Sequence, residues 1–121
     1  DVRKQALGVR HPHVGATLND MGVLLRGMGN HDRALQCYDE ALSIRKEALG
    51  EKHVEVGMTL YNMGILLSDM SEQGRALQCY EEALAISRQV HGDEHPDVGM
   101  TLNNMGNLFD DLGDQTRALR C

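Results

Sequence analysis

A chain of 121 residues is long enough for one modest domain and too short for two. Hydrophobic residues make up 41% of it and aromatic residues only 3%, so we expect a core of aliphatic side chains packed between helices. The formal net charge of −6 disfavours nucleic acid as a partner, because phosphate binding needs clustered Lys and Arg. No apolar run approaches the roughly 18–20 residues of a membrane span, so no membrane partner is expected.

The chain consists of units that recur every 42 residues. Three histidines keep this spacing (His11, His53 and His95), and so do sets of cysteine, methionine and glycine. Aligning residues 9–50 with 51–92 gives 21 identities in 42 positions, and aligning 51–79 with 93–121 gives 16 in 29. We therefore predict a single array over 1–121. Residues 1–8 would end a preceding second helix, 9–50 and 51–92 would be repeats one and two, and 93–121 a partial third repeat.

Each unit contains two helical patterns. In the first repeat, apolar residues at spacings of three and four predict the first helix: Val14, Leu18, Met21, Leu25 and Met28. Pro12 and Pro96 stand where a first helical turn tolerates a missing N–H group. The second helices are expected to begin after N-caps at Asn30 and Asp114.

The ends and faces of the second helices are also marked. Gly50 and Gly92 are expected to end these helices as left-handed C-caps. Gly22, Ala34 and Ala41 recur at equivalent places and would let helices approach closely. One helix pair cannot bury both of its apolar faces, so neighbouring pairs must stack. A Gly-containing turn interrupts every unit, which excludes a continuous heptad coiled coil.

Several segments resemble the tetratricopeptide repeat family in their ordered large and small residues: Leu60-Tyr61-Asn62-Met63-Gly64, then Leu67, Ala76, Tyr80 and Ala83. The 42-residue period and the linker over residues 92–98 are similar to the kinesin light chain group. This resemblance implies an all-α fold: a right-handed superhelical solenoid of antiparallel helix pairs, with about three repeats and incomplete ends. Gly15, Gly57 and Gly99 depart from that group, where Ala would be expected.

In arrays of this kind the first helices line a concave groove, where a peptide ligand would bind. An Asn side chain offers a donor and an acceptor, so a row of them could hold an extended backbone. The alternative is that Asn62 and Asn104 only bridge adjacent helices or hold water. The residues that the resemblance places on this surface are Asn19, Asp20, Val23, Arg26, Tyr61, Asn62, Ile65, Ser68, Asp69, Asn103, Asn104, Asn107, Asp110 and Asp111.

The charge of this surface argues against a clamp for C-terminal carboxylates, which would use Lys and Arg. It carries four carboxylates (Asp20, Asp69, Asp110 and Asp111), and Arg26 is its one clear cation. We therefore predict a protein or peptide ligand with neutral or basic side chains. The alternative is that these carboxylates are merely solvated.

Other chemistries are not supported by the sequence. His91 and His95 form an H-x-x-x-H pair, but Gly92 interrupts the helix that a zinc motif would need, so no metal or other cofactor is expected. Cys37, Cys79 and Cys121 lie about one repeat apart, beyond disulfide reach, which favours buried thiols in a reducing, cytoplasmic compartment. No phosphate-binding loop, nucleophile elbow or acid–base pair appears, so no enzymatic activity is expected.

Two functions compete. The first is a scaffold for protein–protein interaction that binds an extended segment in its groove, as part of a larger adaptor. The second is a structural module that self-associates end to end through uncapped repeats, whose apolar end surfaces would be exposed.

Overall fold

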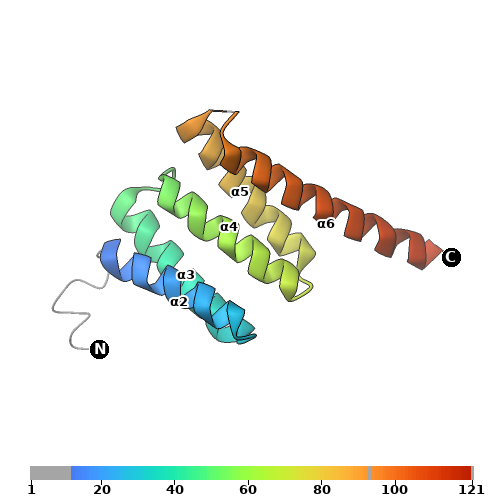
Figure 1. Cartoon of the computed structure of the whole chain (residues 1–121), viewed down its shortest axis with the longest axis horizontal. Coiled ribbons are helices and arrows are strands. Elements are labelled where there is room, and N and C mark those ends of the chain that lie inside the picture. Colours follow the sequence, from blue (N-terminus) through green and yellow to red (C-terminus); the bar gives the residue numbers. More distant parts are fainter. Residues whose placement is uncertain (1–11, 93, 121) are drawn as a thin grey trace.

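The computed structural model describes the backbone of residues 12–92 and 94–120, and the side chains of residues 13–92 and 94–110. This part of the chain is entirely helical between its turns and contains no strand (Figure 1). Five α-helices follow one another: α2 over Pro12–Gly27, α3 over His31–Leu49, α4 over Val54–Asp69, α5 over Gln73–His91 and α6 over Pro96–Arg120.

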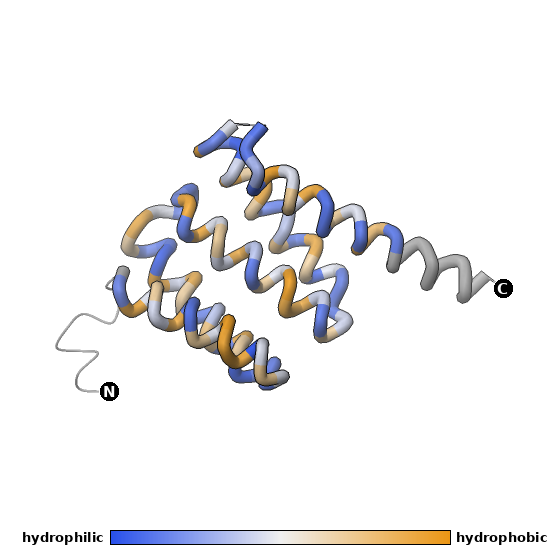
Figure 2. Tube along the Cα trace, in the orientation of Figure 1, coloured by the Kyte–Doolittle hydropathy of each residue, from blue (hydrophilic) through white to orange (hydrophobic). Residues whose placement is uncertain are grey.

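The helices form pairs, and the pairs stack. Within a pair, Leu18 of α2 packs against Ala41 and Ile44 of α3, and Val56 and Leu60 of α4 pack in the same way against α5. Figure 2 shows apolar residues recurring along each helix, as expected for elements that contact neighbours on more than one side. The predicted all-α repeat solenoid is confirmed.

Contacts between successive pairs complete the core. Tyr38 of α3 lies in a cluster with Met63 and Leu66 of α4. Tyr80 of α5 lies in the corresponding cluster, which includes Leu108 of α6. Each second helix therefore packs against the first helix of its own repeat and against that of the next, which is how a solenoid builds one continuous core from short repeats.

Two glycines allow this packing. A Cβ atom added at Gly22 would lie 2.5 Å from Cε1 of Tyr38, and one added at Gly64 would lie 2.6 Å from Cε1 of Tyr80. The tyrosine ring of each second helix thus lies directly on the backbone of the first helix. The predicted close approach at Gly22 is confirmed.

The turn inside each repeat ends the first helix in a Schellman motif. In repeat one the N–H of Asn30 donates to the carbonyl of Leu25, and Gly29 adopts a φ of +78°. In repeat two the N–H of Glu72 donates to the carbonyl of Leu67, and Ser71 adopts a φ of +62°. Asn30 is the N-cap residue of α3, as predicted, but its side chain makes no capping hydrogen bond.

The turns between repeats use glycine at the helix end and histidine at the next helix start. Gly50 and Gly92 have the predicted positive φ, at +95° and +88°, but their ψ of 156° and 169° is extended rather than left-handed helical. His53 precedes α4, and its Nδ1 accepts a hydrogen bond from the N–H of Glu55 at 3.1 Å. His95 does the same for Asp97 at 3.1 Å. These histidines are N-caps, while His11 lies outside the described residues.

The third repeat departs from the prediction, because α6 continues to Arg120 through Gly113 and Asp114, where the alignment places a turn. No described atom lies within 4 Å of a Cβ atom added at Gly106, so this glycine lacks the tyrosine contact that Gly22 and Gly64 make.

The first helix of the third repeat is also partly uncovered. Leu102 and Phe109 are 43% and 54% exposed, whereas their counterparts Leu60 and Leu67 in α4 are 3% and 1% exposed. The difference arises because α5 covers α4, and no described helix follows α6. Among the described helices, none is long and apolar enough to cross a membrane.

Candidate functional site

Polar side chains link the first helices of successive repeats at a constant spacing of 43 residues. The Nδ2 of Asn62 donates to Oδ1 of Asn19 at 3.3 Å, and the Nδ2 of Asn104 donates to the hydroxyl of Tyr61 at 2.9 Å. Asn19 and Tyr61 occupy equivalent positions, so the same bridge is built twice with different acceptors. It joins α2 to α4 and then α4 to α6.

These bridges bear on the predicted asparagine row. Asn62 and Asn104 do bridge adjacent helices, as the alternative interpretation holds. Each bridge uses one N–H group, and each side-chain amide still has its carbonyl oxygen and a second N–H group with which to bind a ligand. Asn19 is different, because it is only 6% exposed and its oxygen also accepts from Thr59 at 3.2 Å.

A groove lies between α4 and α6 and gathers the largest group of the predicted residues. Its volume is about 330 Å³, and we call it the α4–α6 groove. It is lined by Tyr61, Ile65, Ser68, Asp69, Tyr80, Asn104, Asn107 and Leu108. Because the backbones of α4 and α6 are held by the Asn104–Tyr61 bridge, these side chains are presented on rigid elements.

The remaining predicted residues lie outside this groove. Asp20 and Val23 are exposed on α2, and Asn103 and Asp110 are exposed on α6. Asp111 falls in α6, but its side chain lies outside the described residues. The structure thus brings six of the predicted residues together in the groove, namely Tyr61, Ile65, Ser68, Asp69, Asn104 and Asn107, and leaves the others outside it.

The charge of the surface is more balanced than the sequence alone indicates. The Nε of Arg26 lies 2.6 Å from Oδ2 of Asp69, so the predicted lone cation is paired with one of the predicted carboxylates across the two repeats. Both side chains are more than a third exposed, and such pairs contribute at most about 1 kcal/mol. Asp20 and Asp110 remain as exposed carboxylates on the outer two first helices.

A second cavity, of about 220 Å³, lies where α4, α5 and α6 meet, and we call it the inter-repeat pocket. Tyr61 lines both this pocket and the α4–α6 groove, so the two adjoin at this residue. The polar residues of the lining include Asn62, Ser87, Asp97 and Thr101. The sequence-based prediction missed Ser87, Asp97 and Thr101; the threonines at 17, 59 and 101, which recur every 42 residues, were the available signal.

The corresponding place one repeat earlier is filled by Arg45, which is only 4% exposed. Its Nη1 donates to the carbonyl of Glu55 at 3.0 Å and to Oγ1 of Thr59 at 2.9 Å. Its Nε is buried without a hydrogen-bond partner among the described residues. A buried arginine was not predicted, because arginine is seldom fully buried and its position is not repeated as Arg in the next unit.

Burial raises the pKa of two side chains at this face. The pKa of Tyr80 rises to about 12, chiefly because the ring is desolvated and secondly because of the neighbouring Tyr61, whose ring centroid is 5.8 Å away. The pKa of the Cys79 thiol rises to about 11, again chiefly through burial. Both groups are therefore neutral around pH 7, and neither provides a nucleophile or a charge for catalysis.

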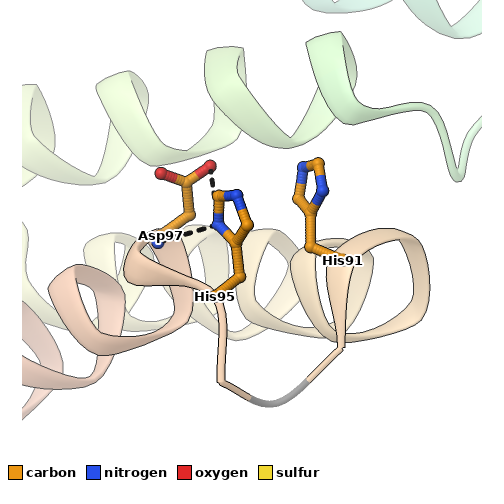
Figure 3. A group of neighbouring side chains, drawn as sticks. All are labelled: His91, His95 and Asp97. Atoms are coloured by element: carbon orange, nitrogen blue, oxygen red, sulfur yellow. Dashed lines mark hydrogen bonds and ion pairs between the residues drawn. The ribbon is translucent and has the colours of Figure 1, made fainter.

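Three side chains near the start of α6 lie close enough to be considered as metal ligands. Potential ligand atoms of His91, His95 and Asp97 lie within 4.8 Å of one another (Figure 3). The two imidazole rings are stacked at 4.0 Å with an interplanar angle of 17°. Their nitrogen lone pairs lie in nearly parallel planes and do not converge on one ion at the usual 2.0–2.1 Å. In this arrangement Nδ1 of His95 caps α6 and lies 3.6 Å from the Asp97 carboxylate.

Cys37 and Cys79 are free cysteines and are half-buried. Their burial is less complete than the predicted buried thiols. Cys121 lies outside the described residues.

Comparison with known proteins places these features in a family. A model of the family described as tetratricopeptide repeat matches residues 1–47, 13–89 and 71–121. Among solved structures, the crystal structure of BtubC (BKLC) from P. vanneervenii is similar, with 25% sequence identity and a TM-score of 0.83. The match covers 99% of this chain and 49% of that one, so the chain spans about half the length of BtubC. No curated protein matches the sequence.

Proposed function

Since the chain belongs to the tetratricopeptide repeat family and resembles its kinesin light chain group, we propose that it binds an extended segment of a partner protein along its first helices. Tetratricopeptide repeats generally mediate protein–protein interaction. The members of the family are typically scaffolds without enzymatic activity. The binding surface proposed for this chain is the face of α4 and α6 that contains the α4–α6 groove.

The observation that supports this site is the convergence of polar and aromatic side chains in the groove. Ser68 and Asn107 lie on opposite walls, and Asn104 and Tyr61 form the bridge between those walls. Binding sites in proteins commonly combine an apolar base with a few fixed polar groups. Here Ile65, Tyr80 and Leu108 supply the apolar part, and the amide groups can bond to the backbone of an extended segment.

The charge of the surface favours a ligand with neutral or basic side chains. Asp20 and Asp110 are exposed, Asp97 lines the neighbouring pocket, and Arg26 is paired with Asp69. An acidic ligand would meet these carboxylates without a free arginine to offset them. The chain would bind this ligand as part of a larger adaptor protein in the cytoplasm.

Selection from a displayed library of random decapeptides tests the proposal. Peptides enriched on the wild-type chain should bind at least about tenfold more weakly to the variant with Asn104→Ala and Asn107→Ala, because each lost amide contact contributes about 0.5–1.5 kcal/mol. The matched control is Gln36→Ala with Gln78→Ala, which alters exposed amides on the second helices. Equal loss of binding in both variants, or none in the groove variant, would refute the proposed site.

A second candidate is end-to-end self-association, which the exposure of Leu102 and Phe109 favours. Two chains could bury these side chains by docking on the uncovered side of α6. Light scattering over a range of protein concentrations tests this directly. A mass that rises with concentration in the wild type, and stays monomeric in Leu102→Ser with Phe109→Ser, supports assembly, whereas a monomer at all concentrations excludes it.

A further inference from the structure

We propose that the inter-repeat pocket binds the guanidinium group of an arginine side chain supplied by the partner. This inference rests on the proposed function, since the arginine would belong to the segment bound along the first helices. It is carried by a comparison within the chain itself. One repeat interface contains its own arginine, and the next repeats the glycine, the threonine and the backbone carbonyl around that arginine, but has no arginine at its position.

At the first interface, Arg45 crosses from α3 to α4. Its stem packs over Gly15, where an added Cβ would lie 3.0 Å from Cγ of Arg45. Its guanidinium group then donates to Oγ1 of Thr59 and to the carbonyl of Glu55. The arginine is almost completely buried, so this site accommodates a whole guanidinium group away from water.

At the second interface, Ser87 stands in place of Arg45, Tyr61 in place of Asn19 and Asp97 in place of Glu55, while the glycine and the threonine recur. Gly57 corresponds to Gly15, and an added Cβ there would meet Ile86 and the carbonyl of Ala83 rather than residue 87. Thr101 corresponds to Thr59, is 2% exposed, and donates to the carbonyl of Asp97 at 2.8 Å. Gly57, Ser87, Asp97 and Thr101 all line the inter-repeat pocket.

The replacement of arginine by serine explains why a cavity exists at this interface. A serine side chain ends at the hydroxyl, so the volume taken by the methylene stem and guanidinium of Arg45 is left open. The acceptors that Arg45 uses are a threonine hydroxyl and a backbone carbonyl, and both recur as Thr101 and Asp97. The pocket therefore has open volume beside the two kinds of hydrogen-bond acceptor that Arg45 uses one repeat earlier.

Charge and access point to the same occupant. Asp97, at the position of Glu55, lines the pocket, and the chain has a net charge of −6. Guanidinium is planar, remains protonated, and presents five donors on an apolar stem, so it suits a largely apolar pocket with a few acceptors better than a strongly hydrated ammonium group does. Because Tyr61 lines both cavities, a segment lying in the α4–α6 groove can direct one side chain into the pocket.

Titration with acetyl-arginine amide, followed by two-dimensional NMR of the isotopically labelled chain, tests the pocket without knowledge of the natural partner. The amide signals of Gly57, Ser87 and Thr101 should shift with the arginine compound and much less with acetyl-citrulline amide, its uncharged counterpart. Ser87→Arg should abolish these shifts by filling the pocket from within. Gln89→Arg, an exposed change of the same charge on the same helix, should retain them.

Two further measurements keep the test decisive. If Ser87→Arg disturbs folding, Thr101→Val removes the hydroxyl acceptor with little change of shape and should weaken the arginine-specific shifts. Decapeptides selected on the wild type should contain arginine at one position, and citrulline there should lower their affinity about ten- to a hundredfold. That difference should vanish in Ser87→Arg, or in Thr101→Val if Ser87→Arg is misfolded.

The outcomes separate the two proposals. Equal shifts with the arginine and citrulline compounds, or shifts that survive Ser87→Arg in a folded variant, would overturn the pocket as a guanidinium site. Selected peptides that bind in the groove with the same affinity when citrulline replaces arginine would also overturn the guanidinium site, while leaving the proposed function intact. Failure to select any peptide would count against the proposed function, and the titration would still decide for or against the pocket.

Discussion

The ring of Tyr80 lies so close to Gly64 that a Cβ atom added at residue 64 would be 2.6 Å from Cε1 of the tyrosine. Gly106, at the equivalent position of the next repeat, has no described atom within 4 Å of such a Cβ. Packing therefore requires glycine at residue 64, where the Tyr80 ring lies on the backbone, but not at the equivalent residue 106.

We predict that Gly64→Ala lowers the free energy of unfolding by about 1–3 kcal/mol, because the added methyl group overlaps the ring. Gly106→Ala should instead raise it by up to about 1 kcal/mol, because alanine favours an uncrowded helix interior. Urea unfolding followed by circular dichroism measures both. Equal effects of the two substitutions would show that the contact with Tyr80 does not govern this position.

A second prediction concerns the turn inside each repeat. Ser71 adopts a left-handed φ of +62° at the position where repeat one has Gly29. Because this conformation disfavours a residue with a Cβ, Ser71→Gly should stabilise the chain by about 1 kcal/mol. Gly29→Ser should destabilise it by a similar amount. Thermal unfolding of both variants gives the comparison, and a lower Tm for Ser71→Gly would contradict the prediction.

A third prediction concerns the histidine that begins α4. Nδ1 of His53 accepts from the N–H of Glu55, so His53→Ala should lower the free energy of unfolding by about 1 kcal/mol. His53→Asp should restore most of it, because a carboxylate can accept the same bond and also favours the helix N-terminus. If His53→Asp does not recover the stability that is lost in His53→Ala, the capping hydrogen bond is not the reason for the loss.

A fourth prediction concerns alkaline pH. Burial raises the pKa of the Cys79 thiol from 9.0 to about 11 in the folded chain. Below pH 9 the thiol is protonated in both the folded and unfolded states, so its full contribution to stability is present. As the pH rises from 9 to 11, only the unfolded chain releases this proton, and the free energy of unfolding should fall by roughly 2 kcal/mol.

The pH dependence of alkylation checks this shift. In a chain with Cys37→Ser and Cys121→Ser, the rate of reaction with iodoacetamide reports Cys79 alone. Its half-maximal value should lie near pH 11 in the folded chain and near pH 9 in urea. Superimposable profiles in the two conditions would show that the folded environment does not hold the thiol in its neutral form.

Much of the fold is predictable from the sequence because its determinants are local and repeated. The proline at the start of α2, the positive φ of Gly50 and Gly92, and the close packing at Gly22 all follow from what each residue type permits. The continuation of α6 through Asp114 is not predictable in this way. There a Gly-Asp pair that is typical of a turn lies inside a helix.

The site is less predictable, because it depends on which side chains meet across repeats. The sequence places Asn62 and Asn104 on first helices, but only the distances show that both bridge adjacent first helices. The ion pair between Arg26 and Asp69 likewise becomes apparent only in the structure. The inter-repeat pocket arises from a difference between repeats, Arg45 against Ser87, whereas a search for repetition draws attention to what stays the same.

The most direct test of the proposed interaction site is to map, by NMR, where a selected decapeptide binds on the isotopically labelled chain. We predict that the largest shifts fall on α4 and α6, at Tyr61, Ser68, Asn104 and Asn107, with little change at Gln36 and Gln78 on the second helices. Shifts concentrated on the exposed sides of α3 and α5 would contradict the proposal that the first helices hold the partner.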